Sequence, residues 1–138
     1  MKTIKIGTPE YSQPDNDTLQ RACNALFESG GGTLEIPAGI YAMRNALHLR
    51  DGVHVVGESG TILQKTPSVQ SALTHICGFG HFEFRVAEPE KFAVGDGVLV
   101  ADNNAGGFYT TAATITARDG DLFFIDRPFA HDYNPGEG

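Results

Sequence analysis

His81, Glu83 and Arg85 are the residues whose types and spacing come closest to a chemical site. They alternate with apolar residues in the stretch HFEFRV, so a β-strand here would place an imidazole, a carboxylate and a guanidinium on one face, with neighbours about 6.6 Å apart. Such a row can grip the carboxylate of a uronate and can move a proton. The pattern also fits an ordinary charged outer face of a sheet. We therefore treat the three residues as ligand-binding candidates and assign no catalytic residue.

Phe108 and Tyr109 are the second ligand-binding candidate. They follow the polar, glycine-rich segment 102–107, which predicts a mobile loop. Exposed aromatic side chains on a loop are suited to stacking on a sugar ring.

No metal or other cofactor is expected, with calcium as the alternative that the sequence leaves open. Carboxylates of the kind that bind calcium, or act as acid and base on sugars, are scattered without diagnostic spacing at Asp96, Asp102, Asp126 and Asp132. Segment 15–17 (DND) has the composition of a calcium-loop start, but no bidentate glutamate follows at the required position, which favours helix capping. His48 and His54 have no second ligand two positions on, which argues against zinc.

The two cysteines, Cys23 and Cys77, lie in apolar surroundings and far apart in the sequence. We predict that both are buried free thiols, with a disulfide as the alternative.

Composition excludes several classes of protein. The 138 residues are 41% apolar and 20% charged, which is typical of a globular chain, and the 17 glycines indicate many turns. A net charge of -7 without a basic patch argues against a nucleic-acid partner. No stretch approaches the ~20 apolar residues of a membrane span. No apolar run follows Met1, so we see no signal peptide, and the location is unknown, or extracellular if a signal was removed.

The elements that would position these residues begin with a helix in segment 15–29. Asp17 is the expected N-cap, Gln20 completes a capping box, and Gly30 predicts the end. Apolar residues recur at helical spacing at Leu19, Ala22, Cys23 and Leu26.

Short strands separated by turn signals follow in segment 30–66. Strands this short cannot bury a face alone, so they are expected to stack as the rungs of a coil whose end the helix covers.

Residues 15–66 resemble the N-terminal part of the pectate-lyase-like right-handed parallel β-helix superfamily. The amphipathic helix, the Gly-Gly-Gly exit, TLEIPAGIY and the later GVHVVGESGTIL carry the resemblance. The superfamily includes polysaccharide lyases, polygalacturonase-type glycoside hydrolases, epimerases and phage tailspike depolymerases. Because all of them share this segment, the resemblance implies a fold and a carbohydrate role but no particular reaction.

The expected fold is mainly β: an N-terminal cap helix and the first rungs of a right-handed parallel β-helix, with a small antiparallel β insertion. A single domain, 1–138, would contain the cap helix (15–29), the rungs (30–86), the insertion (87–127) and a tail (128–138). The insertion is implied by resemblance: FAVGDGV followed by a hairpin around Gly120 looks similar to a small antiparallel β insertion that some β-helix proteins carry near the N-terminal end. The interior stack is expected to contain Leu34, Ile36, Ile40, Leu47, Leu49, Val53, Val55, Ile62, Phe82 and Phe84.

The resemblance implies the N-terminal portion of a carbohydrate-active β-helix protein, of polysaccharide lyase or glycoside hydrolase type, with a polysaccharide or oligosaccharide as its partner. This portion is expected to be inactive by itself, because the family's catalytic residues usually lie on later rungs and no position here matches a catalytic motif. The alternative is a non-catalytic structural or attachment module that forms a homo-oligomer through the open end of its β-helix.

Overall fold

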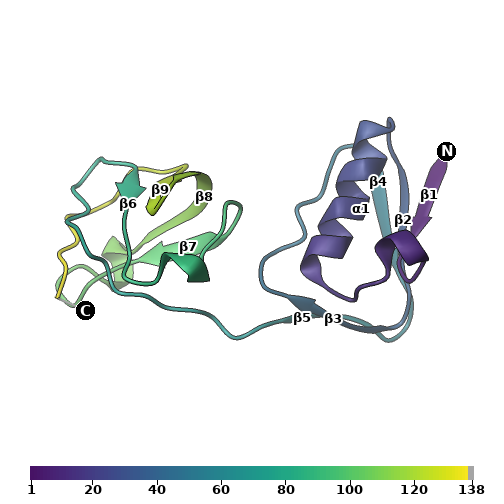
Figure 1. Cartoon of the computed structure of the whole chain (residues 1–138), viewed down its shortest axis with the longest axis horizontal. Coiled ribbons are helices and arrows are strands. Elements are labelled where there is room, and N and C mark those ends of the chain that lie inside the picture. The colour runs from purple at the N-terminus through teal and green to yellow at the C-terminus, as the bar shows by residue number, and fades with distance from the viewer. Residues whose placement is uncertain (137–138) are drawn as a thin grey trace. The chain divides into compact units, whose positions relative to one another are not determined.

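The computed structural model describes residues 1–136 and shows two compact units, Met1–Ser68 (unit 1) and Val69–Gly138 (unit 2), each with its own core (Figure 1). The described chain is mainly β with one α-helix, as the sequence predicts. No helix within it is long and apolar enough to cross a lipid bilayer.

Unit 1 consists of strands in two parallel sheets and the single helix. Its elements are β1 (Lys2–Lys5), the 3-10 helix η1 (Pro9–Tyr11), α1 (Asn16–Glu28), β2 (Gly32–Ile36), β3 (Gly39–Met43), β4 (Val53–Gly57) and β5 (Thr61–Lys65). The sheets have the orders β1-β2-β4 and β3-β5. Gly32 pairs with Val53 and Gly39 pairs with Thr61. The number of residues between paired positions is therefore nearly the same in the β2–β4 pair as in the β3–β5 pair.

The N-cap of helix α1 lies two residues before the expected one. Asp15, and not Asp17, is the N-cap: its backbone is extended and its Oδ1 accepts a hydrogen bond from the Thr18 amide at 2.9 Å. Asp17 lies in the first turn and forms an ion pair with Arg44 at 3.2 Å. The predicted stripe faces inward, and all four of its residues are fully buried.

The stripe of α1 packs against the inward side chains of β2 and β3, so the core of unit 1 lies between the helix and these strands. The buried strand residues there are Leu34, Ile36, Tyr41 and Met43. Leu47, Val53 and Val55 pack at the margin of this core and are partly buried.

Strands β3 and β5 turn the opposite face inward from the one expected. Ile40 and Ile62 are register partners and both are exposed, whereas Tyr41 and Met43 are buried. Because side chains alternate, a shift of one residue reverses the whole face. The expected interior positions of Ile40 and Ile62 are therefore wrong.

The segment after β3 is not a strand, and Leu49 is 71% exposed instead of interior. Two amide side chains of α1 bind its backbone in place of a neighbouring strand. Asn16 Oδ1 accepts from the Asn45 amide at 2.7 Å, and Gln20 bonds both the amide (2.8 Å) and the carbonyl (3.0 Å) of His48. The backbone polar groups are thus paired without a strand, and Leu49 is free to face outward.

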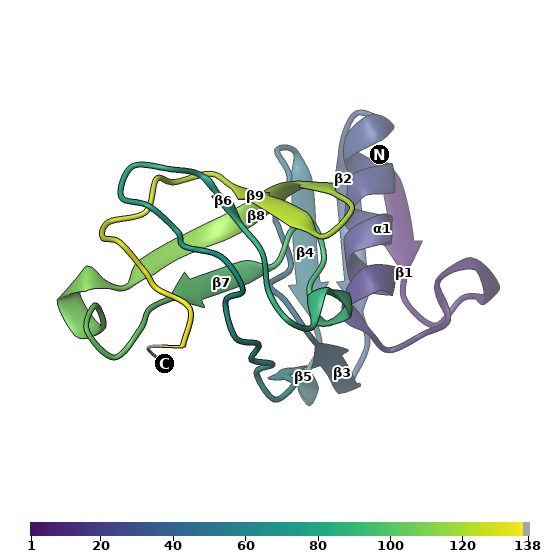
Figure 2. The ribbon, with the colours of Figure 1, turned by 60° about the vertical axis from the view of Figure 1, so that its left-hand side comes forward.

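Unit 2 is built on one antiparallel sheet with the order β6-β9-β8-β7 (Figure 2). Its elements are β6 (Glu83–Phe84), η2 (Pro89–Lys91), β7 (Gly97–Val100), η3 (Gly107–Tyr109), β8 (Thr111–Asp119) and β9 (Leu122–Ile125). The predicted hairpin around Gly120 is confirmed by the pairing of β8 with β9. The largest fully buried side chains of the unit belong to Phe123, Phe129, Tyr133, Ile115 and Cys77.

Residues 69–86 belong to unit 2, which corrects the expected single domain with rungs continuing to residue 86. Leu73 pairs antiparallel with Val86, and β6 pairs antiparallel with β9. The parallel pairing therefore ends with β5. Within residues 81–86 only Glu83 and Phe84 form a strand, so the expected alternation breaks down before them: Phe84 is buried, whereas Phe82 is exposed and not interior.

The expected tail is part of the core of unit 2. Cys77 and Tyr133 exchange two backbone hydrogen bonds of 2.9 Å, and the Phe129 amide donates to the His81 carbonyl at 2.9 Å. Phe129 and Tyr133 are buried. Residues 137 and 138 of the expected tail lie outside the described residues.

The two cysteines are free and buried, as predicted, and each unit holds one of them.

Candidate functional site

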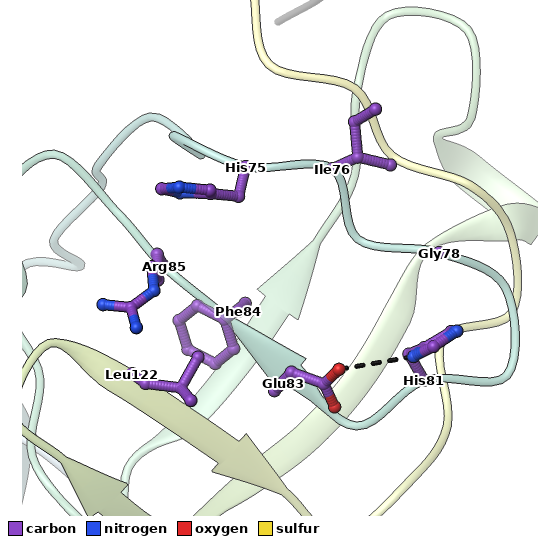
Figure 3. Close-up of a pocket in the computed structure, with 8 residues that line it drawn as sticks. All are labelled: His75, Ile76, Gly78, His81, Glu83, Phe84, Arg85 and Leu122. Carbon is purple, nitrogen blue, oxygen red and sulfur yellow. Dashed lines mark hydrogen bonds and ion pairs between the residues drawn. The ribbon is translucent and has the colours of Figure 1, made fainter.

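A pocket of about 400 Å³ in unit 2 brings together the three charged residues singled out in the sequence (Figure 3). Its lining consists of His75, Ile76, Gly78, His81, Glu83, Phe84, Arg85 and Leu122. Strand β6 supplies Glu83 and Phe84, and β9 supplies Leu122. The sequence pattern therefore identified three of the lining residues, His81, Glu83 and Arg85. It did not identify His75 and Leu122, which come from other segments of the chain.

Glu83 is held at one side of the pocket by two contacts. His81 Nδ1 lies 3.3 Å from Glu83 Oε1, and the Phe82 amide donates to Glu83 Oε2 at 3.2 Å. A carboxylate oxygen has a second lone-pair direction, so both oxygens can still accept a hydroxyl group. Glu83 and His81 thus form a partly exposed polar pair at this side of the pocket.

Arg85 is half-buried in the pocket, and no residue within 1–136 forms a hydrogen bond or ion pair with its guanidinium. Its backbone is fixed, because its carbonyl accepts from the Thr74 amide at 3.1 Å. Figure 3 shows its side chain on the side of His75, with the Phe84 ring between it and the pair Glu83–His81. A guanidinium in this position offers its N–H groups to an incoming anion.

Apolar atoms complete the pocket. Phe84 is buried and stacks on Phe123 with ring centroids 5.2 Å apart, and Leu122 lies beside it in Figure 3. His75 is held through its Nδ1, which lies 2.8 Å from the Thr74 hydroxyl. The pocket therefore offers an apolar surface between a cationic side and a carboxylate–imidazole pair.

Cys77, next in sequence to two lining residues, does not supply a nucleophile at neutral pH. Burial, and secondly the charge of Glu83, raise the pKa of its thiol to about 11. Since the thiolate is the reactive form, this thiol is inert in the folded unit.

Phe108 and Tyr109 do not line this pocket. They form η3, and their side chains are 96% and 51% exposed. Their ring centroids are 5.7 Å apart, and the Tyr109 ring lies 5.2 Å from the ring of His131. Sequence reasoning missed His131, because it was placed in an unpaired tail.

The four scattered carboxylates each accept a backbone hydrogen bond in a loop or turn. Asp96 bonds the Ala93 amide at 2.8 Å, Asp126 the Thr114 amide at 2.8 Å and Asp132 the Phe79 amide at 2.7 Å. Within residues 1–136 no group of three or more His, Cys, Asp or Glu residues is placed to hold a metal ion.

Asp102 is the most strongly held of the four and is only 8% exposed. Its Oδ2 accepts from the Asn134 amide at 2.9 Å, and its Oδ1 accepts from the amides of Asn104 (2.9 Å) and Ala105 (2.6 Å). These backbone donors, the Asn134 amide first among them, hold the pKa of the Asp102 carboxyl below its usual value. Asp102 thereby ties the loop before η3 to the last described residues.

Comparison with known proteins gives two solved structures and no family. No protein-family model matches the sequence, and no curated protein matches it. The Gp54 tailspike of Acinetobacter baumannii bacteriophage AP22, solved in complex with A. baumannii capsular saccharide, is 14% identical with a TM-score of 0.43, over 91% of this chain and 26% of the tailspike. The tailspike gp61 of Pseudomonas phage phi297 is 18% identical with a TM-score of 0.41, over 87% of this chain and 23% of the tailspike. The chain thus spans about a quarter of each tailspike.

Proposed function

We propose that this chain is a saccharide-binding part of a carbohydrate-active protein of the right-handed parallel β-helix class, and that the pocket of unit 2 binds an acidic oligosaccharide. The observation that carries the proposal is Arg85, a half-buried residue whose guanidinium has no partner within residues 1–136 and which lines a pocket together with the carboxylate of Glu83. In unit 1 the two parallel strand pairs β2–β4 and β3–β5 have nearly equal sequence separations between paired residues, which supports the β-helix class.

The chemistry of the pocket matches a sugar that carries a carboxylate. The planar guanidinium of Arg85 can donate two parallel hydrogen bonds to a uronate carboxylate. Glu83 can accept hydrogen bonds from ring hydroxyl groups, and the partly buried side chain of Leu122 offers an apolar surface to the C–H groups of the sugar. A volume of about 400 Å³ lies within the range of small-molecule sites.

We further propose that this chain binds the saccharide without hydrolysing it. Glycoside hydrolysis uses two carboxyl groups on either side of the scissile bond. Glu83 is the only carboxylate among the residues that line the pocket. Binding therefore needs no group beyond those present, whereas hydrolysis would need a second carboxylate.

The test is isothermal titration calorimetry of the full chain with hexasaccharides of polygalacturonate and polymannuronate. We expect Arg85→Ala to weaken binding by about tenfold or more, because a charge-assisted hydrogen bond contributes about 1.5–3 kcal/mol. Arg85→Lys should lie between, since a lysine cannot bind a carboxylate bidentately. Arg127→Ala is the matched control, because it removes the same charge from an exposed position outside the pocket.

Two outcomes would contradict the proposal. Unchanged affinity in Arg85→Ala, or no binding of either acidic hexasaccharide, would remove the pocket as the site. Release of shortened or unsaturated products by the unaltered chain would show that it is an enzyme in its own right.

A second candidate function is a non-catalytic structural module that associates through the open edge of unit 1. Strands β4 and β5 end their sheets, and neither has a further neighbouring strand within residues 1–136. The inward side chains at this edge, Val53, Val55 and Leu63, are only partly buried or exposed. Unpaired edges of this kind are templates for pairing with another chain. Sedimentation over a range of concentrations tests this function: dimers or trimers would support it, and a monomer at all concentrations would dismiss it.

A further inference from the structure

The rings of Phe108, Tyr109 and His131 form an exposed cluster, which we call the aromatic shelf. The centroids of Phe108 and Tyr109 are 5.7 Å apart with nearly perpendicular planes (87°), and those of Tyr109 and His131 are 5.2 Å apart. Residues from the loop before β8 and from the end of the chain thus meet at one place.

The stability of unit 2 does not account for the shelf. Phe108 is 96% exposed, so it contributes almost nothing to the core. Burying a phenylalanine side chain would stabilise the fold by about 1.5–3 kcal/mol, and here that free energy is not used. A ring in this position is available to a ligand.

The backbone beneath the shelf is fixed by a directed chain of hydrogen bonds. The Ala130 amide donates to the Thr111 hydroxyl (2.9 Å), and the buried Tyr133 hydroxyl donates to the carbonyl of Tyr109. Since the proton of Tyr133 is used in this way, the Thr111 hydroxyl donates to Tyr133 across 2.7 Å. A shelf held from below loses little backbone freedom when a ligand binds, which favours affinity.

His131 adds one polar group to the shelf, and its tautomer follows from its neighbour. Its Nδ1 lies 2.9 Å from the backbone carbonyl of Asp132, which can only accept, so Nδ1 carries the proton. In the neutral ring Nε2 is then an acceptor, and no residue within 1–136 donates to it. A ligand hydroxyl group can fill this position.

We propose that the aromatic shelf is a second saccharide site, separate from the pocket, that takes a neutral pyranose. The C–H face of the sugar stacks on the rings of Phe108 and Tyr109, while His131 Nε2 accepts one of its hydroxyl groups. The saccharide class rests on the proposed function, but the shelf differs from the pocket in having no cationic residue among its three members. Three rings also form a much smaller surface than the roughly 800 Å² that each partner of a stable protein interface contributes.

The test follows the backbone amide NMR signals of Gly106, Gly107 and Thr110 in the full chain. The probes are neutral hexasaccharides of glucan, galactan, mannan and chitin, with the polygalacturonate hexasaccharide for comparison. We expect at least one neutral hexasaccharide to shift these signals and Phe108→Ala to weaken that binding by about tenfold.

Phe108→Leu is the decisive variant, because it keeps an apolar side chain but removes the ring. Stacking predicts a loss close to that of Phe108→Ala, and unchanged binding in Phe108→Leu would overturn the proposal. Leu99→Ala, an exposed apolar position in β7, is the control and should bind as the unaltered chain does. His131→Phe keeps a ring but removes the acceptor, and it should also weaken binding.

The two sites can fail independently. Binding of the acidic hexasaccharide in an Arg85-dependent manner, with no neutral hexasaccharide at the shelf, would overturn this inference and leave the pocket intact. Neutral binding that depends on Phe108 but not on Arg85, without acidic binding, would support the shelf and remove the pocket.

Discussion

At the scale of single residues, Gly32 is the glycine at which an added side chain would meet the closest backbone contact. Strand β1 runs beside β2, and a Cβ atom on Gly32 would lie 2.1 Å from the carbonyl oxygen of Lys2 and 2.9 Å from the side chain of Leu26. Its φ of +148° is also one that residues with side chains rarely adopt. The glycine therefore lets β1, β2 and α1 approach one another closely.

Gly32→Ala is expected to destabilise unit 1 by about 3 kcal/mol or more, because the strand or the helix must move to admit the methyl group. Gly30→Ala is the matched control: its φ is also positive (+93°), but nothing lies within 4 Å of the added atom. It should cost only the left-handed backbone, about 1–2 kcal/mol. Urea unfolding followed by circular dichroism measures both, and equal losses would contradict the close approach at Gly32.

Asp102 is expected to make the stability of unit 2 depend on acid. Backbone donors lower the pKa of its carboxyl in the folded state, so the folded unit binds this proton less readily than the unfolded chain does. The stabilisation is fully present above the unfolded pKa of about 3.9, and it is lost as the pH falls through the lower folded pKa.

Asp102→Asn should flatten this acid dependence and weaken unit 2 at neutral pH, because an amide nitrogen cannot accept from the Asn134 amide. Thermal unfolding from about pH 2 to 7 measures the effect. Asp119→Asn changes an exposed carboxylate near the hairpin turn and should keep the acid slope. An acid slope that persists in Asp102→Asn would assign it to other groups.

At the scale of elements, the sequence predicted α1 and the β8–β9 hairpin because a helical stripe and a glycine turn are local signals. The inward face of β3 was not predictable in this way. Ile40, Tyr41, Ala42 and Met43 are all apolar, so alternation cannot choose between two faces. The choice depends on tertiary contacts, because Tyr41 and Met43 pack in the core that the buried face of α1 also lines.

The candidate site was predictable to the same extent. His81, Glu83 and Arg85 lie close in the sequence, so their pattern could be recognised. His75, Leu122 and His131 reach their places only through antiparallel pairing over long distances in the chain, which no local pattern encodes.

Leu34→Asp is expected to unfold unit 1, whereas Leu49→Asp should melt nearly as the unaltered chain does. Leu34 is fully buried under α1, and an unpaired charge there would cost several kcal/mol. Leu49 is exposed, so its replacement should change stability by about 0.5 kcal/mol or less. Differential scanning calorimetry of the two variants compares them, and a strongly destabilised Leu49→Asp would restore the inward face that the sequence alone suggested.

At the scale of the whole molecule, the described residues 1–136 form two cores that share no buried residue. Unit 1 carries the parallel sheets and the open edge, and unit 2 carries the pocket and the aromatic shelf. The proposed saccharide contacts therefore all lie in unit 2, and the proposed association surface lies in unit 1. Variants in unit 1 can thus be tested for saccharide binding by unit 2, and variants in unit 2 for association through unit 1.

The buried free cysteine in each unit can report how often that unit opens. Cys23 lies on the buried face of α1 in unit 1, Cys77 lies between two pocket-lining residues in the sequence of unit 2, and burial raises the pKa of both thiols. An alkylating reagent can reach each sulfur only while its own unit is open, so two labelling rates, separated by peptide mass, time the opening of the two units in one sample. A saccharide that binds unit 2 should lower the labelling rate of Cys77 and leave the labelling rate of Cys23 unchanged.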